Sequence, residues 1–583
     1  MTEVWSELTV GALSGLALAA ILLAAGERIR RVLRIPCSPL LRAPVAWGLG
    51  SWAVGMAVLI LGLLQLFRPV PLLGLAALSA AAGRWSGLKA PMKRIFEYAL
   101  AGLPLIAVAL APPFFYDAWV YHLGLPWQAL QDGAIRAHPA NLFSTFPPLA
   151  QLIYALPLAA GAVRAPALIH FFGYCAAAVA ARGLACRLGA SPVPAFLAGV
   201  CLLYLPFSPL IAGFPAAESW TVCGILASMA MALSSRKDTK TGLAAGWMAG
   251  IGVASRLQGI TWAALAAVTY LTRRKRSLAA LGVFVGAAAL GAAPWWLKNT
   301  FLLRDPFAPL GWHREGIDTL WRDSHSALHL AGNLSDLIRQ VTSALQGKAW
   351  LLAPLLAGGL LAARSRSRRS VLVLAGIGAA GALTWALTGA LERFLVPSVV
   401  LLLIAAACGS GRLGASVAFL AIGLTMAPGI ASAVGMFKQV GGLSAIGPAS
   451  KVYSALLVSD PYSGFLACAD LPSDARVLFV AEPRAFLFPR RFETSSQHDR
   501  SPLVGLLRTS ISPEKARARL VGLGYTHLLV NVPEMRRMGK DYPILPWTDP
   551  DGQSAFVALT RILGPPVILV GDMVVYSLGA TRP

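Results

Sequence analysis

The sequence predicts a mainly α-helical protein, a polytopic membrane helix bundle followed by a small α/β domain. Of its 583 residues, 56% are hydrophobic and only 13% are charged, whereas soluble domains carry roughly a quarter charged residues. Apolar stretches of the length that crosses the hydrocarbon core recur up to about residue 440. Beyond about residue 450, short apolar runs bounded by turn residues replace them.

The basic residues support membrane topology rather than nucleic-acid binding. The formal net charge is +24, but the basic residues cluster in short links between apolar stretches, as the positive-inside rule describes. We therefore expect no nucleic-acid partner. There is no CxxC motif and no Cys/His cluster with metal-ligand spacing, so we predict neither a disulfide framework nor a zinc site. The N-terminus, MTEVWSE, is acidic where a signal peptide is basic, so the first apolar run is expected to be a retained helix.

The basic residues between the first apolar runs predict how the chain is oriented in the membrane. The basic clusters 28–34 and 84–94 should be cytoplasmic, which places the N-terminus and the loop 114–163 outside. Residues 1–94 then form an N-terminal extension of about three spans. The run 148–163 is short, and a crossing there would put Arg182 and Arg187 outside, so we favour an interfacial or re-entrant helix. The first four runs cover residues 8–26, 44–66, 70–83 and 95–113.

A membrane core is predicted over residues 95–440, with outer loops at 114–163 and 298–348. The basic flanks around 239–272 require an out-and-back pair of helices, with Arg256 near its outer turn. The total is about 14 spans, which leaves the C-terminal region outside. The remaining spans are expected near 165–183, 190–211, 217–234, 277–296, 349–363, 370–389, 394–408 and 413–434.

Residues 441–583 are predicted to form an extracytoplasmic soluble α/β domain. ARVLFVAE (475–482) and YTHLLVN (525–531) have the short apolar pattern of buried strands. SPEKARARLVGLG (512–524) begins with an N-cap serine and ends with glycine, which predicts a helix. VVYSLG (574–579) is expected to close the sheet.

Polar residues in unusual positions gather at the predicted outer face. Ionisable groups near membrane depth are costly and usually functional, although an arginine at a helix end can simply snorkel and Glu218 could serve the helix dipole. Glu392 could pair only with its neighbour, and His122 and His138 could be packing residues of the loop. The residues concerned are Asp117, Glu218, Arg256, Lys298, Asn299, Glu392 and Arg393.

One carboxylate with several cations on one face predicts a particular chemistry. Asp117 follows a span inside FFYDAWVYHL, where a carboxylate contributes little to packing. A carboxylate can act as general base on a hydroxyl, and Arg or Lys can hold a phosphate and stabilise its charge as it leaves. The sequence therefore favours a phosphate at the membrane surface with a lipid tail between the helices.

The segment Asp117–Pro148, D-x-x-x-YHL-x-x-P-x-x-x-L-x-x-G…P-x-N-x-F-S-x-F-PP, resembles the first outer loop of bacterial GT-C-type membrane glycosyltransferases. This family includes the protein O-mannosyltransferases and the lipid A aminoarabinose transferases. GIGVASRLQG (250–259), PWWLKNTFLLRDPFAPLGW (294–312) and ERFLVPSVVLLL (392–403) are similar in placement to later family motifs. The resemblance covers about 95–583.

The resemblance implies a GT-C fold and an inverting glycosyltransferase of the bacterial inner membrane, acting on the periplasmic face. Its partners would be membrane lipids, a polyprenyl-phosphate-linked sugar donor, and a lipid, glycan or protein acceptor whose hydroxyl the loop aspartate activates. Carried over by position, Asp117 is the base. Arg256, Lys298 and Arg393 would contact the donor phosphate, and Tyr121, His122, Asn141, Glu218 and Asn299 would complete the substrate-binding set.

One departure bears on metal dependence. Many relatives place a second acid beside the loop aspartate, whereas Ala118 and Trp119 follow Asp117 here. We therefore expect no cofactor and do not favour a divalent metal, with Glu218 the only nearby candidate for the second acid. Arg256 stands where the family more often has Lys, and an arginine can bind phosphate with bidentate geometry.

Two other functions remain open from the sequence. A transporter or flippase of a lipid-linked saccharide would favour ionisable groups at mid-membrane and inverted repeats with broken helices, and we find neither. A membrane-anchored scaffold would bind its partner through residues 441–583 and would tolerate substitution in the Asp117 loop.

Overall fold

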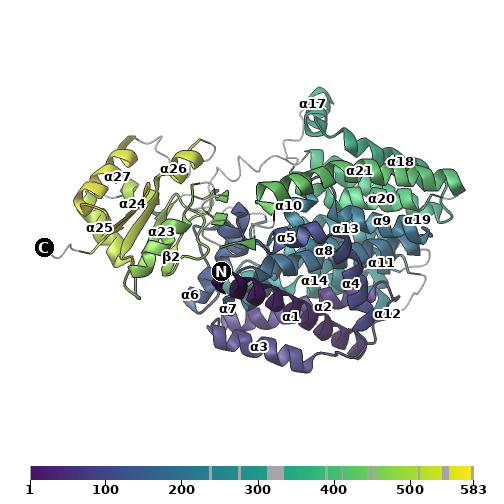
Figure 1. Ribbon diagram of the computed structural model, residues 1–583, viewed down its shortest axis with the longest axis horizontal. Helices are drawn as coiled ribbons and strands as arrows, with labels where there is room; N and C mark the ends of the chain where they lie inside the picture. Colours follow the sequence, from purple (N-terminus) through teal and green to yellow (C-terminus); the bar gives the residue numbers. More distant parts are fainter. Residues whose placement is uncertain are drawn as a thin grey trace.

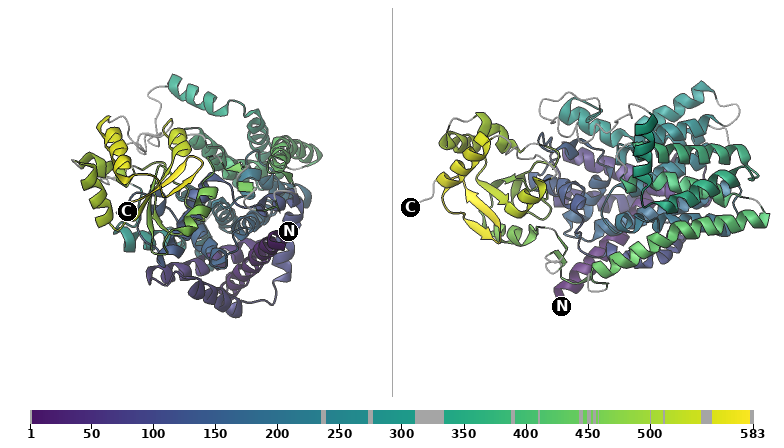
Figure 2. Two further views of the ribbon diagram at one scale, coloured as in Figure 1. Left: turned by 60° about the vertical axis from the view of Figure 1, so that its left-hand side comes forward. Right: turned by 90° about the horizontal axis from the view of Figure 1, so that it is seen from above.

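The computed structural model describes residues 2–579 except 235–238, 273–276, 311–333, 388–390, 410, 443–445, 449–451, 454–455, 458, 500, 510–511 and 541–549. A large helix bundle carries a small sheet domain at one end, and the N-terminus lies at the same end (Figure 1). The remaining views show the same two-part arrangement (Figure 2).

The stretches predicted to span the membrane are helices or broken helix pairs. The first half of the bundle contains α1 (Thr2–Val32), α2 (Arg42–Leu63), α3 (Pro69–Ala82), α4 (Lys89–Ala101), α5 (Leu103–Ala109), α8 (Ala165–Arg187), α9 (Pro192–Leu203), α10 (Ser208–Ala212) and α11 (Glu218–Ala232). The second half contains α12 (Thr239–Ser255), α13 (Gly259–Leu271), α14 (Leu278–Gly291), α15 (Ala293–Leu303), α17 (Leu334–Leu345), η3 (Ala349–Leu351), α18 (Leu352–Ala362), α19 (Arg368–Leu387), η4 (Glu392–Leu395), α20 (Val396–Ala407) and α21 (Gly411–Gln439).

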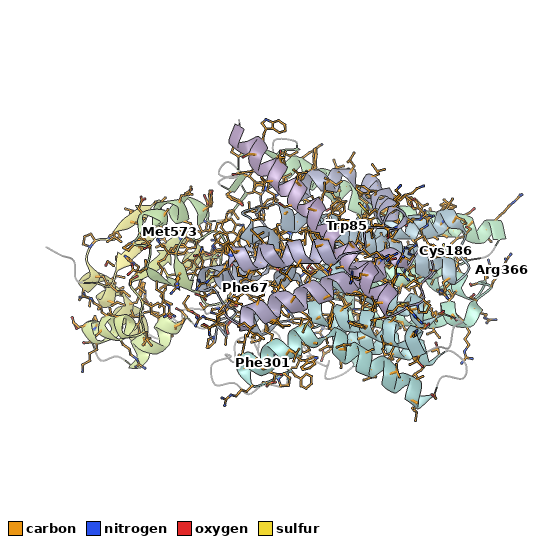
Figure 3. All side chains as sticks on the ribbon, turned by 90° about the horizontal axis from the view of Figure 1, so that it is seen from below. Phe67, Trp85, Cys186, Phe301, Arg366 and Met573 are labelled. Carbon is orange, nitrogen blue, oxygen red and sulfur yellow. The ribbon has the colours of Figure 1, made fainter. Side chains whose placement is uncertain are left out.

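The composition and the helices make this an integral membrane protein. Within the described residues, α1, α2, α8, α19 and α21 are each long and apolar enough to cross a membrane. A sixth crossing results if α14 and α15, bent by 59° at their junction, count as one span. The predicted total of about 14 spans stays a prediction. Figure 3 labels Cys186 and Arg366 at the end of the bundle opposite Met573 of the sheet domain.

The first predicted outer loop is ordered and largely buried. Its elements are η1 (Ala118–His122), α6 (Gly124–Asp132), η2 (Leu142–Thr145) and α7 (Leu149–Ala159). The turn η1 is π-helical, a geometry that often marks functional sites. Helix α7 has 11 residues and therefore reaches only about 16 Å, roughly half the hydrocarbon thickness. Its packing against α2, α3, α6 and α8 agrees with a helix that does not cross alone.

Helices α1 and α2 pack closely because glycines face the partner backbone. A methyl group added to Gly50 would lie 1.8 Å from the carbonyl oxygen of Leu22, and one added to Gly26 would lie 1.8 Å from that of Ala46. Small residues permit this approach in membrane helices. The α1–α2 contact therefore depends on both glycines.

Gly50→Ala is expected to lower the thermal stability of the purified protein, because the new methyl group must push the helices apart, at about 1–3 kcal/mol. The melting temperature in detergent measures this. The matched control is Gly74→Ala in α3, where the added methyl group meets no atom within 4 Å. Equal melting temperatures for the two variants would contradict the close packing.

The C-terminal sheet has the strand order β2-β1-β3-β5-β4. Strands β2, β1 and β3 are parallel, with Val477 opposite His527, and β5 and β4 add antiparallel. The predicted strands and the helix capped by Ser512 are confirmed. The elements are α23 (Tyr462–Ala467), η6 (Cys468–Asp470), β1 (Arg476–Val480), β2 (Arg491–Glu493), α24 (Pro502–Thr509), α25 (Pro513–Gly522), β3 (His527–Asn531), α26 (Val532–Met538), α27 (Pro550–Leu563), β4 (Ile568–Val570) and β5 (Met573–Ser577).

The two faces of this sheet pack against different partners, as the alternation of side chains along a strand requires. Leu478 and Leu528 point to the face covered by α24, α25 and α27. Phe479, Leu529 and Val575 point to the other face and belong to the same hydrophobic core as the bundle. The sheet domain is therefore packed onto the bundle through a continuous apolar core.

Candidate active site

Asp117 lies at the turn that leads into η1, and its carboxylate faces the bundle. Its Oδ2 accepts a hydrogen bond from Arg393 Nη1 at 2.6 Å and another from Tyr121 Oη at 3.1 Å. Tyr121 is one helical turn further along η1. Arg393 belongs to η4, the short turn that starts α20. The fold thus joins the first loop to a helix end 276 residues away.

A second ion pair lies beside the first. Glu218, at the start of α11, is 3% exposed and pairs with Arg256 from the end of α12. Arg393 Nε is 3.9 Å from the same Glu218 oxygen, so Arg393 lies between the two carboxylates. The Phe394 ring packs against both cations, with its centroid 4.9 Å from Arg256 Cζ and 5.5 Å from Arg393 Cζ. The site therefore contains two carboxylates and two guanidinium groups.

The charges around Asp117 keep it ionised. Burial alone would raise the pKa of this carboxyl group, but the charge and hydrogen bond of Arg393, with a smaller contribution from the Tyr121 hydrogen bond, lower it below its usual value. Burial lowers the pKa of His122 to about 3, so its imidazole is neutral at physiological pH. Both ring nitrogens of His122 lack a hydrogen-bond partner in the described part of the chain. A neutral, buried imidazole therefore lies beside an ionised carboxylate.

A cavity of about 290 Å³, part of it open, adjoins the guanidinium pair. Arg256, Arg393 and Gln258 line it, and Gln258 Oε1 accepts a 3.3 Å hydrogen bond from Arg256 Nε. The other lining residues are Glu218, Thr221, Val222, Trp262, Phe394 and Pro397. A partly open cavity lined by two guanidinium groups and by apolar side chains suits an anionic group attached to a hydrocarbon.

Helix α15 holds the part of the loop that contains η2. Lys298 Nζ donates to the carbonyl oxygens of Ser144, at 2.5 Å, and Phe146, at 2.8 Å. Asn299 Nδ2 donates to the carbonyl oxygen of Thr145 at 2.9 Å, and Asn141 caps η2 by accepting the N–H of Phe143. These bonds are made entirely to the loop backbone.

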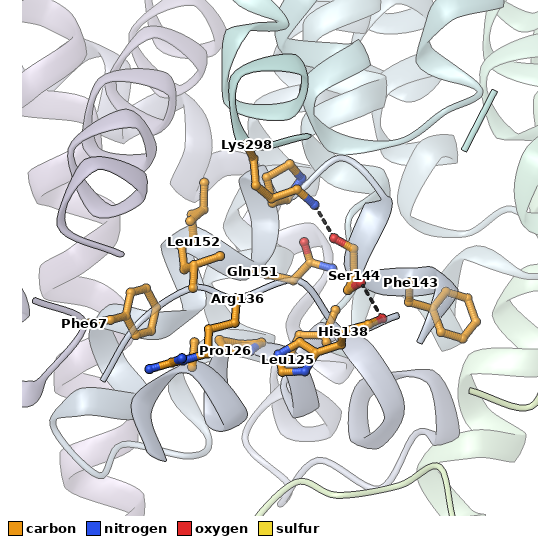
Figure 4. A pocket seen from close by; sticks show the side chains of 13 residues that line it. Phe67, Leu125, Pro126, Arg136, His138, Phe143, Ser144, Gln151, Leu152 and Lys298 are labelled. Carbon is orange, nitrogen blue, oxygen red and sulfur yellow. Dashed lines mark hydrogen bonds between the residues drawn. The ribbon is translucent and has the colours of Figure 1, made fainter. Parts of the chain in front are cut away.

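A larger pocket of about 480 Å³, partly open, lies beside this part of the loop (Figure 4). Phe143 lines it and stacks on Tyr121 with a ring separation of 4.2 Å, so the Phe143 ring lies between the pocket and Tyr121, the hydrogen-bond partner of Asp117. Figure 4 shows Lys298 bonded to the backbone of Ser144 at the pocket wall. Leu125, Pro126, Ile135, Pro148 and Leu152 give it an apolar floor, and Arg136 and His138 lie at its edge.

Lys298→Met is expected to destabilise the protein by about 1–3 kcal/mol, because it removes the Lys298 donor from the partly buried carbonyl groups of residues 144 and 146. The melting temperature of the detergent-solubilised protein measures the loss. Thr342→Ala, which removes an exposed hydroxyl bonded within its own helix, is the control. An unchanged melting temperature for Lys298→Met would contradict a loop-holding role.

The structure brings together six residues singled out from the sequence: Asp117, Tyr121, His122, Glu218, Arg256 and Arg393. Asn141, Lys298 and Asn299 instead contact the loop backbone. Glu392 lies 3.4 Å from Lys348 and does not form its ion pair with Arg393. Sequence reasoning missed Phe394 and Gln258, although each is within two residues of a predicted arginine.

Within the described ranges, no group of three His, Cys, Asp or Glu residues is arranged to hold a metal ion. The acids nearest the site, Asp117 and Glu218, are each paired with arginine.

No protein-family model and no curated protein matches the chain. Among solved structures, it is similar to ArnT from Cupriavidus metallidurans bound to undecaprenyl phosphate, with a TM-score of 0.51 and 13% identity over 85% of this chain and 99% of that chain. The apo form of the same protein gives a TM-score of 0.49 at 14% identity, covering 84% of this chain and 99% of that chain. The Archaeoglobus fulgidus oligosaccharyltransferase with Zn and sulfate gives 0.41 at 13% identity, covering 74% and 67%.

The first of these comparisons shows a shared fold. The predicted fold class, a GT-C-type helix bundle with a small C-terminal α/β domain, is confirmed by it and by the sheet described above.

Proposed function

We propose that this protein is an integral-membrane glycosyltransferase. It moves a sugar from a polyprenyl-phosphate donor to an acceptor hydroxyl on the periplasmic face of a bacterial inner membrane. The observation that supports this most strongly is the pairing of Asp117 with Arg393 beside Arg256, in a fold shared with ArnT, which has been solved with undecaprenyl phosphate bound.

The donor phosphate would bind at the guanidinium pair. Arg256 and Arg393 line one cavity and both lie against Phe394, which fixes their planes. Two fixed guanidinium groups can hold the phosphate of the ground state and stabilise the additional charge that develops on it as it leaves. The apolar walls beyond, including Trp262 and Pro397, would contact the first isoprene units of the tail.

The acceptor hydroxyl would be activated by Asp117. The carboxylate takes the hydroxyl proton while the oxygen forms a bond to the anomeric carbon of the sugar. On the opposite face, the bond between that carbon and the phosphate oxygen breaks, and its electron pair leaves on the polyprenyl phosphate. Attack opposite the leaving group inverts the anomeric configuration. The protonated carboxyl group then releases its proton to water.

Arg393 would connect donor binding to the base. The Arg393 guanidinium lies 2.6 Å from Asp117 and 3.9 Å from Glu218. A donor phosphate would compete for the same N–H groups. Its binding would therefore weaken the effect by which Arg393 lowers the pKa of Asp117. Donor binding would thereby make the carboxylate a stronger base at the moment when it is needed.

The pocket beyond the Tyr121–Phe143 stack is where we place the acceptor. Its apolar lining, with Arg136 and His138, suits an amphiphilic acceptor, and Phe143 of its wall stacks on Tyr121, which is hydrogen-bonded to Asp117. A lipid, a glycan or a protein side chain could each present the hydroxyl. No metal ion has a role in this scheme.

A binding measurement tests the donor assignment. Purified protein in nanodiscs is expected to bind undecaprenyl phosphate but not undecaprenol, and Arg256→Ala is expected to weaken binding roughly 10-fold or more, as for loss of a charge-assisted contact. Equal binding of both lipids would contradict the phosphate site. A flippase would instead move a lipid-linked sugar across proteoliposomes without forming a glycosidic bond.

A further inference from the structure

The backbone around Asp117 is held on both sides by the sheet domain. On one side, Tyr116 Oη donates to Glu534 Oε1 of α26 at 3.0 Å. On the other, the carbonyl oxygen of Trp119 accepts the N–H groups of Ala485 and Phe486, at 3.2 and 3.3 Å. The base therefore lies inside a four-residue stretch whose two ends are bonded to the sheet domain.

The group that binds Tyr116 is itself rigid. Glu534 is fully buried, and both of its oxygens are bonded by Arg537, at 2.6 and 2.8 Å. Its N–H is capped by Asn531, and Arg484 lies 3.4 Å away. A carboxylate with this many partners has little freedom, so it is a fixed acceptor for the tyrosine hydroxyl.

The ring of Tyr116 is also enclosed by cations. Arg537 Cζ is 5.1 Å and Arg484 Cζ is 5.5 Å from the ring centroid. Both distances fall within the range of cation–π attraction. Burial, with Glu534 nearby, raises the pKa of Tyr116, so the hydroxyl remains a donor throughout the physiological range. The tyrosine is thus fixed by its hydroxyl and by its ring.

The second contact is equally constrained. Trp119 is fully buried, and its ring packs edge-on against Phe486 and Tyr453. Its carbonyl oxygen lies 2.5 Å from where a methyl group would stand on Gly124, so only glycine fits there. The sheet domain and the loop therefore meet in one packed layer, continuous with the bundle core.

We infer that the sheet domain contributes to the active site by positioning the base. Tyr116, bonded to Glu534 of that domain, is a positioning residue that keeps the Asp117 carboxylate directed at Arg393. The inference rests on the proposed function, and it assigns the C-terminal domain a role that the catalytic scheme above does not contain. The carboxylate and the anchor are adjacent in sequence, so freedom at Tyr116 is transmitted directly to Asp117. A small misplacement of a reacting group costs rate rather than binding.

The test uses the full-length protein with Tyr116→Phe and Glu534→Ala. Each removes one partner of the anchor and leaves Asp117, Arg256 and Arg393 unchanged. In cells that lack the native copy, each variant is expected to lower the glycan product per molecule of enzyme roughly 10- to 100-fold. Binding of undecaprenyl phosphate by the purified variants should stay within about twofold, because the anchor does not contact the phosphate. Because both act through one contact, the double variant should be little worse than either single variant.

Two matched controls separate positioning from general destabilisation. Tyr98→Phe removes another buried tyrosine hydroxyl, bonded to the carbonyl oxygen of Phe196 in the bundle. Arg517→Ala removes a bond to the carbonyl oxygen of Leu578 inside the sheet domain. Both should retain product formation. Hydrogen exchange over residues 113–123 should become faster in Tyr116→Phe and stay unchanged in the controls.

The outcomes are distinguishable. Wild-type product formation, or wild-type exchange over 113–123, in Tyr116→Phe would overturn the positioning role and leave the proposed function standing. Equal losses in Tyr116→Phe and Arg517→Ala would also overturn it. Full activity of Asp117→Asn would overturn Asp117 as the base, and absence of any sugar-transfer product from the wild type would overturn the proposed function itself, whatever the exchange data show.

Discussion

Asp117→Asn is expected to abolish sugar transfer. The amide has the size of the carboxyl group and can still accept a hydrogen bond from Arg393, but it cannot take the proton of an acceptor hydroxyl. Loss of a general base typically lowers the rate by roughly 10²- to 10⁴-fold. Product formation at saturating donor, per molecule of folded enzyme, is the quantity to measure.

Folding and donor binding should survive this change. Arg393 remains within 3.9 Å of Glu218, so it is not left without a carboxylate. The melting temperature and the affinity for undecaprenyl phosphate should therefore stay close to those of the wild type. Transfer at the wild-type rate by a well-folded Asp117→Asn protein would rule out Asp117 as the base.

Arg393→Ala is expected to cause a comparable loss and, in addition, a change in pH dependence. It removes the proposed contact to the leaving phosphate, at a cost of roughly 10²- to 10³-fold in rate. It also removes the charge that opposes the effect of burial on Asp117, so the pKa of Asp117 should rise. A base is active only when deprotonated, so the acid limb of the pH–rate profile should move to higher pH.

The pH–rate profile of the wild type supplies the reference. With the pKa of Asp117 below its usual value, this group should not limit the rate of the wild type at neutral pH. Glu392→Gln is the matched control. It removes a charge next to Arg393 in the sequence, but Glu392 pairs with Lys348, whereas Asp117 is paired with Arg393. An acid limb at the same pH in the wild type and Arg393→Ala would contradict the electrostatic coupling between Arg393 and Asp117.

Much of the fold could be predicted because its signals are local. Apolar length and basic links predicted the helices, and the alternation of apolar and turn residues predicted β1 and β3. Strands β2 and β4 have three residues each, too few to show a pattern, and they exist because a neighbouring strand offers hydrogen bonds. The break between α14 and α15 has a local cause, because Pro294 in the first turn of α15 cannot continue the hydrogen bonds of α14.

The site was only partly predictable. Topology placed Asp117 and Arg393 on one face, but their ion pair joins residues 276 positions apart, and such a pairing depends on how the helices pack. For Lys298, the residue type suggested a phosphate contact, but its ammonium group donates to two carbonyl groups of the loop. The residue type alone did not reveal these partners. Tyr116 was adjacent to the predicted base, yet its partner Glu534 lies in a helix that no sequence pattern linked to the loop.

The central claim, transfer of a sugar from a polyprenyl phosphate with Asp117 as base, is tested most directly by mass spectrometry of the cell-envelope glycans and polyprenyl lipids. Cells without this protein would be compared with cells that carry the wild type or Asp117→Asn. We expect one sugar modification to disappear and its polyprenyl-phosphate-linked donor to accumulate, with reversal by the wild type and not by Asp117→Asn. Identical glycan and lipid profiles with and without the protein would contradict the claim.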